Sequence, residues 1–346
     1  MQAIPVKIGA FTIGGGRPVR IQSMCNTSTA DAAATAAQIL ELEAAGCEIV
    51  RVSVPDIDSA NALTAIKKQI HIPLVADIHF DYRLAIAALE HGADKIRINP
   101  GNIGSPDRVR AVAQAAAAHG APIRIGVNSG SVEKDLLKTH GGPTAQALAD
   151  SALRHASLLE DCNFSNIVIS VKASDVRTTI EACRQLREQT PYPLHLGVTE
   201  AGGFLSGSVK SAIGIGALLA DGIGDTIRVS LTDDPVQEIK VAKEILKALN
   251  LRQFGAKLIS CPTCARTKID MISLAKQVEQ YLQTIDKPIT VAVMGCAVNG
   301  PGEAREADVG IAGGIGEGLL FKHGQPAYKV PEAELFAALK REIELL

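Results

Sequence analysis

The sequence has no tryptophan, few other aromatic residues (3%) and almost no net charge, with 35 Lys and Arg against 37 Asp and Glu among 346 residues. This balance produces no field that attracts nucleic acid or an anionic membrane, so we expect neither as a partner. The longest apolar runs are only as long as strands, and we expect no segment that spans a bilayer. Low-complexity segments and solenoid repeats are absent as well. Any anion-binding site in this chain must therefore be local.

The chain also lacks several signatures of redox proteins. It has neither the C-x3-C-x2-C spacing of many radical enzymes nor a flavin or nicotinamide motif. Its seven cysteines occur without a secretory leader and without the short format of a disulfide scaffold. This usage indicates a reducing cytoplasm, in which thiols stay free or bind metal.

Short apolar runs alternate with Ala- and Leu-rich amphipathic stretches through most of the chain. The predicted strands cover residues 19–24, 48–54, 73–80, 95–99, 122–128, 166–172, 193–200 and 225–231. Eight strand-then-helix units are more typical of a closed parallel barrel than of an open sheet. We therefore predict an α/β protein with a (β/α)8 TIM barrel in residues 1–254 and a small α+β domain in residues 255–346.

Polar residues recur near the ends of these strands with one parity, and β-branched residues take the other. Arg51, Arg97, Arg124 and Arg228 each lie between two Val or Ile residues. Because side chains alternate across a strand, the branched set is expected to pack on the helices and the polar set to point into the barrel mouth. The same parity is followed by Asp77, His79, Ser170 and Lys172.

This pattern predicts a cationic site at the barrel mouth, whose ligand is a compact polyanion. Arginine forks suit phosphate oxygens. Internal salt bridges to Asp77 and Glu200 are the alternative, but two carboxylates do not neutralise five cations. The predicted cations are Arg51, Arg97, Arg124, Lys172 and Arg228, and the predicted uncharged donors are Asn99, Asn128 and Ser230.

Three side chains near the same mouth are candidates for acid–base work. Asp77 and His79 are one pleat apart, so they can form an oriented acid–base or hydroxyl-binding pair; alternatively, His79 is a hydrogen-bonded interior histidine. Glu200 precedes an Ala-Gly-Gly loop, where it can donate a proton or serve as an ordinary cap or surface carboxylate.

The second region carries a candidate metal site. Cys261 and Cys264 form a C-x2-C pair, and Cys296 follows about thirty residues later in a Gly- and Pro-rich run that ends at Glu303. Zinc would need a fourth ligand such as His323. An iron–sulfur cluster with Glu303 at one non-cysteine iron is the other interpretation. The remaining cysteines are predicted to be small core residues: Cys25, Cys47, Cys162 and Cys183.

Six short motifs of the chain are distinctive in combination: IQSM (21–24), ADIHF (76–80), KIRINPGN (95–102), GVNSG (126–130), SCPTC (260–264) and MGCAVNGPGE (294–303). Through them the sequence resembles, nearly from end to end, the bacterial 4-hydroxy-3-methylbut-2-en-1-yl diphosphate synthases of the non-mevalonate isoprenoid pathway. The resemblance implies that Cys261, Cys264, Cys296 and Glu303 hold a [4Fe-4S] cluster. It also implies reductive ring opening and dehydration of 2-C-methyl-D-erythritol 2,4-cyclodiphosphate, with electrons from flavodoxin or ferredoxin.

The expected topology predicts that the active site needs two chains. Barrel chemistry lies at the carboxyl ends of the strands, whereas the eighth helix returns the chain to the opposite face. The short connection at 252–255 does not carry the second domain back to its own mouth. We therefore expect a head-to-tail homodimer, as the resemblance also implies.

Two rival functions remain open from the sequence. One is a non-redox phosphate-binding barrel, such as an aldolase or a pterin-type transferase, with a structural zinc domain. The other is an iron–sulfur sensor or scaffold that binds phosphorylated ligands without turnover. Iron and acid-labile sulfide in the purified protein would exclude the zinc domain. Consumption of the cyclodiphosphate with a reductant would exclude a protein that only binds its ligand.

Overall fold

The computed structural model describes residues 2–296 and 305–346. The chain divides into two compact units between Arg252 and Gln253, where the sequence predicted a division between residues 254 and 255. Throughout the described ranges, none of the helices combines the length and apolar character needed to cross a membrane.

Unit 1 contains a sheet of eight parallel strands that is almost closed into a barrel. The sheet order is β8-β7-β6-β5-β4-β3-β10-β9, and a parallel bridge between Ile169 and Leu194 links its two edges. The predicted (β/α)8 barrel is therefore confirmed. The strands are β3 (Arg20–Met24), β4 (Ile49–Ser53), β5 (Leu74–Asp77), β6 (Lys95–Ile98), β7 (Ile123–Asn128), β8 (Ile167–Lys172), β9 (His195–Leu196) and β10 (Thr226–Ile227).

The last two strands are shorter than the apolar patterns predicted. Strand β9 ends before Gly197, where an added Cβ would lie 2.6 Å from the carbonyl oxygen of Arg228. The two backbones therefore approach too closely for a side chain at this position. The residues after β9 and β10 continue as loops at the mouth.

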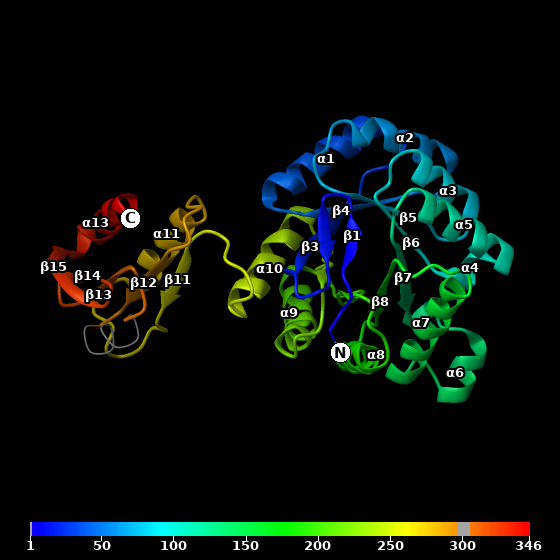
Figure 1. Ribbon diagram of the computed structural model, residues 1–346. Coiled ribbons are helices and arrows are strands. Elements are labelled where there is room, and N and C mark those ends of the chain that lie inside the picture. Colours follow the sequence, from blue (N-terminus) through cyan, green and yellow to red (C-terminus); the bar gives the residue numbers. More distant parts are fainter. Residues whose placement is uncertain (1, 297–304) are drawn as a thin grey trace. The chain divides into compact units, whose positions relative to one another are not determined.

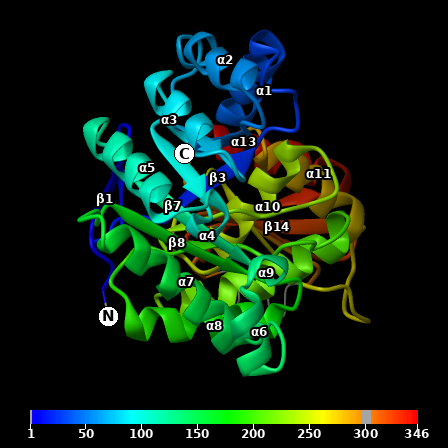
Figure 2. The same cartoon turned by 90° about the vertical axis from the view of Figure 1, so that its right-hand side faces the viewer.

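Helices surround the strands on the outside (Figures 1 and 2). Several begin at an Asp whose carboxylate accepts a hydrogen bond from a backbone N–H in the first turn, as Asp31, Asp175 and Asp234 do. The long helices are α1 (Ala32–Ala45), α2 (Ile57–Lys67), α3 (Tyr82–Glu90), α5 (Pro106–Ala118), α7 (Ala145–Glu160), α8 (Val176–Gln189), α9 (Phe204–Ala220) and α10 (Pro235–Ala248); the short ones are α4 (Pro100–Ile103), η1 (Ser129–Ser131) and α6 (Lys134–His140).

An N-terminal hairpin closes the amino end of the barrel. Strands β1 (Val6–Ile8) and β2 (Phe11–Ile13) pair antiparallel, and their apolar side chains pack on Ile49, Val75 and Val168 near the starts of barrel strands. This packing covers the apolar interior at the amino end. The polar residues lie at the other end of the barrel, where the strands have their carboxyl ends.

Unit 2 has a mixed five-stranded sheet with two helices packed on it. Strands β11, β12 and β13 are parallel, and β13, β14 and β15 are antiparallel. Val278 of α11 and Leu339 of α13 belong to one core with Val293 and Ile311 of the sheet, as the predicted α+β domain requires. The elements are β11 (Lys257–Ser260), α11 (Met271–Leu282), β12 (Thr290–Met294), β13 (Val309–Gly313), β14 (Glu317–Lys322), β15 (Gln325–Pro331), η2 (Glu332–Glu334) and α13 (Leu335–Leu345).

Candidate active site

A polar cavity of about 280 Å³ lies at the carboxyl ends of the barrel strands. The strand register explains its composition, because Ser53, Asp77, Arg97 and Arg124 are paired in turn across β4, β5, β6 and β7. Side chains on one level of parallel strands therefore meet inside the barrel. The lining residues are Met24, Arg51, Asp77, His79, Arg97, Arg124, Gly126, Asn128, Ser170, Lys172, Thr199, Arg228 and Ser230.

The structure brings all five predicted cations into this cavity, together with Asp77, His79, Asn128 and Ser230. Asn99 is not in the lining: it is buried, and its Oδ1 accepts a hydrogen bond from the N–H of Gly101 at 3.1 Å, which caps α4. Glu200 is also outside the lining, but it directly follows Thr199 at the cavity edge. The predicted ligand Glu303 lies outside the described residues.

Asp77 is the one carboxylate among the described residues that line the cavity. Its Oδ1 accepts a hydrogen bond from Arg97 Nη1 at 3.1 Å, and its Oδ2 lies 3.7 Å from Arg51 Nε. Burial disfavours the charged carboxylate, but Arg51, Arg97 and Arg124 together outweigh it and lower the pKa of Asp77. Burial lowers the pKa of Arg51 to about 10, although Asp77 opposes that change.

Several guanidinium donors in the cavity have no hydrogen-bond partner within the described part of the chain. They are Arg97 Nε, Arg124 Nε, Arg124 Nη2 and Arg228 Nε, all buried. Buried donors are nearly always paired in folded proteins, because an unpaired one loses its hydration without compensation. Oxygen atoms of a polyanion would satisfy these donors.

A polar layer supports the cavity from below. Lys172 Nζ lies 3.4 Å from His195 Nε2, and His195 Nδ1 lies 2.8 Å from Thr226 Oγ1. Burial, and then the neighbouring arginines, lower the pKa of Lys172 well below its usual value. Burial, and then Lys172, lower that of His195. A neutral His195 can accept from Lys172 and donate to Thr226, and this arrangement orients the lysine.

Sequence reasoning missed part of this environment. Met24 lines the cavity, and its sulfur accepts hydrogen bonds from Arg51 Nε and Nη2 at 3.1 and 2.8 Å. Lys95 is fully buried, with its Nζ 3.3 Å from Gln22 Oε1. In the sequence Lys95 stands two residues before Arg97, so its side chain points to the same face of the strand. This shared parity was the sequence signal that could have identified Lys95 as an interior residue.

Glu200 has an unusual backbone. Its φ is +53°, in the left-handed region that non-glycine residues rarely adopt, and its side chain is exposed. Such strain of about 1–3 kcal/mol is found mainly where the surrounding structure imposes it, often next to functional sites. Glu200 directly follows Thr199, which lines the cavity.

The cysteines of unit 2 lie at one end of its sheet. Ser260 of β11 pairs with Val293 of the parallel strand β12, so Cys261 is level with Met294, and Cys296 follows two residues later at the same end of the sheet. Cys261 Sγ accepts a hydrogen bond from the N–H of Gly295 at 3.2 Å. Cys264 is exposed, and hydrogen bonds from Arg266 and Thr267 lower its pKa, which favours the thiolate.

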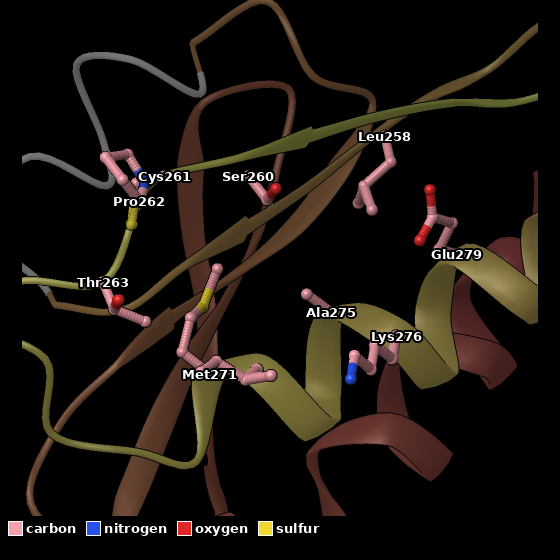
Figure 3. Close-up of a pocket in the computed structure, with 10 residues that line it drawn as sticks. Leu258, Ser260, Cys261, Pro262, Thr263, Met271, Ala275, Lys276 and Glu279 are labelled. Carbon is pink, nitrogen blue, oxygen red and sulfur yellow. The ribbon is translucent and has the colours of Figure 1, made fainter. Parts of the chain in front are cut away.

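A hollow of about 400 Å³ lies beside Cys261, between the end of β11 and helix α11 (Figure 3). Among the described residues, no three His, Cys, Asp or Glu side chains are close enough together to hold a metal ion; this set does not include Glu303. His323, the alternative zinc ligand, follows β14, and its N–H donates to the carbonyl of Asp308 just before β13. Strands β12 and β13 are parallel, so the start of β13, where His323 lies, is at the opposite end of the sheet from the cysteines, which follow the ends of β11 and β12. His323 is therefore too far away to be a fourth zinc ligand beside them.

Of the four cysteines that the sequence predicted to be core residues, three are buried and one is half-buried. Cys25, Cys47 and Cys183 are buried, and burial raises the pKa of each thiol to about 12. Cys162 is half-buried, and its Sγ donates to the carbonyl of Leu158 at 3.3 Å. Burial therefore disfavours, at Cys25, Cys47 and Cys183, the thiolate form that binds metal.

Two family models match almost the whole chain: the GcpE TIM-barrel domain over residues 3–243 and the GcpE protein C-terminal domain over residues 257–345. The chain belongs to the GcpE family. A relative from Lysinibacillus sphaericus is 58% identical over 99% of this chain and 92% of its own length, and one from Listeria monocytogenes is 59% identical over 99% and 93%. Both are named 4-hydroxy-3-methylbut-2-en-1-yl diphosphate synthase (flavodoxin). These matches confirm the resemblance that the motifs indicated. Because the relatives at this identity are named as a synthase, the GcpE-family chain is an enzyme.

Solved structures with distant sequences share the barrel of the GcpE-family chain. Dihydropteroate synthase from Yersinia pestis is 14% identical with a TM-score of 0.51, covering 71% of this chain and 97% of its own. Type I 3-dehydroquinate dehydratase from Clostridium difficile is 16% identical with a TM-score of 0.52, covering 72% and 98%. At these identities the likeness shows the fold alone.

Proposed function

We propose that the protein converts 2-C-methyl-D-erythritol 2,4-cyclodiphosphate to 4-hydroxy-3-methylbut-2-enyl diphosphate. Two electrons and two protons enter, the bond between C2 and its phosphate oxygen breaks, and the C3 hydroxyl leaves as water. The observation that carries this proposal is the basic cavity at the barrel mouth, with its unpaired buried guanidinium donors among the described residues. Relatives 58–59% identical over nearly the whole chain are named for the synthase that forms this product.

In this proposal the cavity residues bind the diphosphate. The unpaired nitrogens of Arg97, Arg124 and Arg228 donate to phosphate oxygens, and Asn128 and Ser230 are uncharged donors beside them. An anion among these cations favours their charged forms, Lys172 included. Binding therefore offsets the mutual repulsion of the cations.

Asp77, His79 and Glu200 are proposed for the hydroxyl and proton-transfer parts of the reaction. His79 Nε2 lies 4.0 Å from Asp77 Oδ2, and the His79 side chain is half exposed, so the ring can reach a substrate hydroxyl. Glu200 is proposed to deliver a proton to the departing C3 hydroxyl. Replacing Glu200 with Gln should lower kcat by about 100-fold with less than a threefold change in substrate affinity; a variant with an unchanged kcat contradicts the assignment.

The donor set of unit 2 fits an iron–sulfur cluster. Soft thiolates from Cys261, Cys264 and Cys296 would hold it, with Glu303 as the fourth ligand. When bound, a [4Fe-4S] cluster of this kind supplies single electrons and an iron with an exchangeable position. The hydrogen bond from Gly295 N–H to Cys261 Sγ would stabilise the thiolate. All seven cysteines are free thiols, which suits the cytoplasmic location we propose.

We also propose a head-to-tail homodimer in which unit 2 of one chain covers the barrel mouth of its partner. Arg252 at the end of unit 1 donates to the carbonyl of Val19 at 3.1 Å and to Glu48 at 2.5 Å, directly before β3 and β4. The chain therefore leaves unit 1 at the amino ends of the strands, opposite the cavity. The stretch from Arg252 to Lys257 reaches at most about 18 Å, too little to pass around the helices to the mouth.

Mixing two inactive variants tests the dimer. Cys264→Ser impairs unit 2 and Arg124→Ala impairs the cavity. If sites form between chains, a heterodimer regains up to half of the wild-type activity, because one of its two sites is intact. No recovery in a heterodimer whose formation is verified by mass spectrometry contradicts the proposal.

Anaerobic purification tests the proposed function as a whole. We expect a brown protein that contains iron and acid-labile sulfide and consumes the cyclodiphosphate when reduced flavodoxin is supplied. Colourless protein with zinc supports the non-redox barrel. Iron–sulfur protein that binds the cyclodiphosphate without turnover supports a sensor.

A further inference from the structure

Glu238 is a buried carboxylate on an outer helix that reaches the basic cavity. It lies in the first turn of α10, and its side chain is only 5% exposed. The neighbouring buried residues Pro235, Ile239 and Ala242 form the apolar stripe of the helix, so Glu238 occupies a position where an apolar residue would be expected. A charge at such a position needs specific partners.

The carboxylate of Glu238 accepts three hydrogen bonds from barrel residues. Its Oε1 accepts from Arg228 Nη2 at 3.4 Å and from the N–H of Leu231 at 3.1 Å. Its Oε2 accepts from Ser23 Oγ at 3.0 Å. The two contacts of Oε1 span the segment that follows β10, and this segment includes Ser230.

These contacts connect α10 to the cavity through Arg228. Arg228 and Ser230 line the cavity, and Arg228 Nε has no partner among the described residues. Holding Nη2 on Glu238 leaves Nε available for a ligand. A short rigid tether of this kind reduces the conformational entropy that Arg228 loses when it binds an anion.

We propose that Glu238 is a positioning residue that holds Arg228 and the segment 229–231 in the geometry that binds one phosphate group. It touches no substrate and acts through Arg228. The inference rests on the proposed function, because it takes the cavity as the diphosphate site.

A double-mutant cycle tests the inference on the full-length protein. Glu238→Leu removes the acceptor and fills its space with an apolar side chain, Glu238→Gln keeps an acceptor at Oε1, and Arg228→Ala removes the group through which Glu238 acts. Binding of the cyclodiphosphate, and separately of inorganic pyrophosphate, is measured by calorimetry without reductant. Glu244→Ala is the matched control, because Glu244 lies on the same helix with its side chain 70% exposed.

We expect Glu238→Leu to weaken binding of both ligands about tenfold, Glu238→Gln by less than threefold, and Glu244→Ala not at all. In the Arg228→Ala background the tenfold effect should shrink to about twofold. Equal losses in both backgrounds, or full affinity in Glu238→Leu, overturn the inference. If Glu238→Leu does not fold, a Gln variant that weakens binding more than tenfold, with a wild-type melting temperature, overturns it as well.

Failure of the proposed function can be distinguished from failure of the inference about Glu238. Wild-type protein that binds pyrophosphate but not the cyclodiphosphate contradicts the proposed substrate, and the pyrophosphate cycle still decides the role of Glu238. Protein that binds neither ligand overturns both proposals.

Discussion

Replacing Asp77 with Asn should destabilise the barrel and strengthen its binding of simple polyanions. Each contact of Asp77 with Arg97 or Arg51, at 3.1 and 3.7 Å, corresponds to roughly 4–5 kcal/mol of Coulomb attraction at an effective dielectric constant of about 20, before desolvation is counted. Removing one partner of a buried pair costs about 3–5 kcal/mol, and Asn retains one acceptor, so we expect a loss of about 3 kcal/mol in the free energy of unfolding. For a unit of this size the loss lowers Tm by about 6–12 °C.

The same substitution removes the carboxylate that competes with a ligand for the guanidinium groups. A carboxylate roughly 6 Å from a phosphate, at an effective dielectric constant of about 40, opposes binding by about 1.4 kcal/mol, so pyrophosphate should bind about tenfold more tightly. Turnover of the cyclodiphosphate should nevertheless fall, because Arg51 and Arg97 lose their orientation.

Hydrogen exchange read by mass spectrometry on β5 and β6 peptides, with and without pyrophosphate, measures the stability of the barrel separately from that of unit 2. Asp107→Asn is the control, since Asp107 is 88% exposed and pairs only with Arg110 at the surface among the contacts described. An Asp77→Asn barrel as stable as this control, with unchanged pyrophosphate affinity, refutes the view that Asp77 offsets the repulsion between the cations.

Three further outcomes are expected. Burial lowers the pKa of Lys172 in the free protein, and a bound anion raises it. Between the two pKa values pyrophosphate binding should therefore take up a proton, and its affinity should fall as pH rises from the lower value to the higher one. Calorimetry in buffers of different ionisation enthalpy measures this uptake; Lys172→Met should lose it, and identical uptake in the variant contradicts the assignment. Gly126→Ala should raise KM about tenfold, because the new Cβ would lie 2.4 Å from Arg97 Nε and displace that side chain. Gly130→Ala is the control and should leave KM unchanged, because its new Cβ would meet no atom within 4 Å apart from those of its chain neighbours. Cys264→Ser should lose iron, sulfide and visible absorption after anaerobic purification, and a variant that keeps all three excludes Cys264 as a ligand.

Most of the barrel and most of its basic cavity could be predicted because both follow from short-range patterns. Alternation places Arg97 and Arg124 on one face of their strands, and parallel register then brings that face to the mouth. Asn99 was predicted in the same way but caps α4, because the chain turns into a helix at Pro100 and the amide satisfies its first turn. The one local signal at Glu238 was a charged residue on an apolar helical stripe, and this signal does not identify a partner.

The amino-acid sequence alone determined the family, the order of strands and helices, and the chemical types gathered at each site, since these depend on motifs and periodicities within a few residues. Only the tertiary structure decided which side chains meet. It paired Asp77 with two of the arginines, placed His323 at the opposite end of the sheet from the cysteines, and brought Glu238 to Arg228. These contacts depend on how strands and helices distant in sequence pack together, and burial then selects the partners because a buried charge without one is unstable.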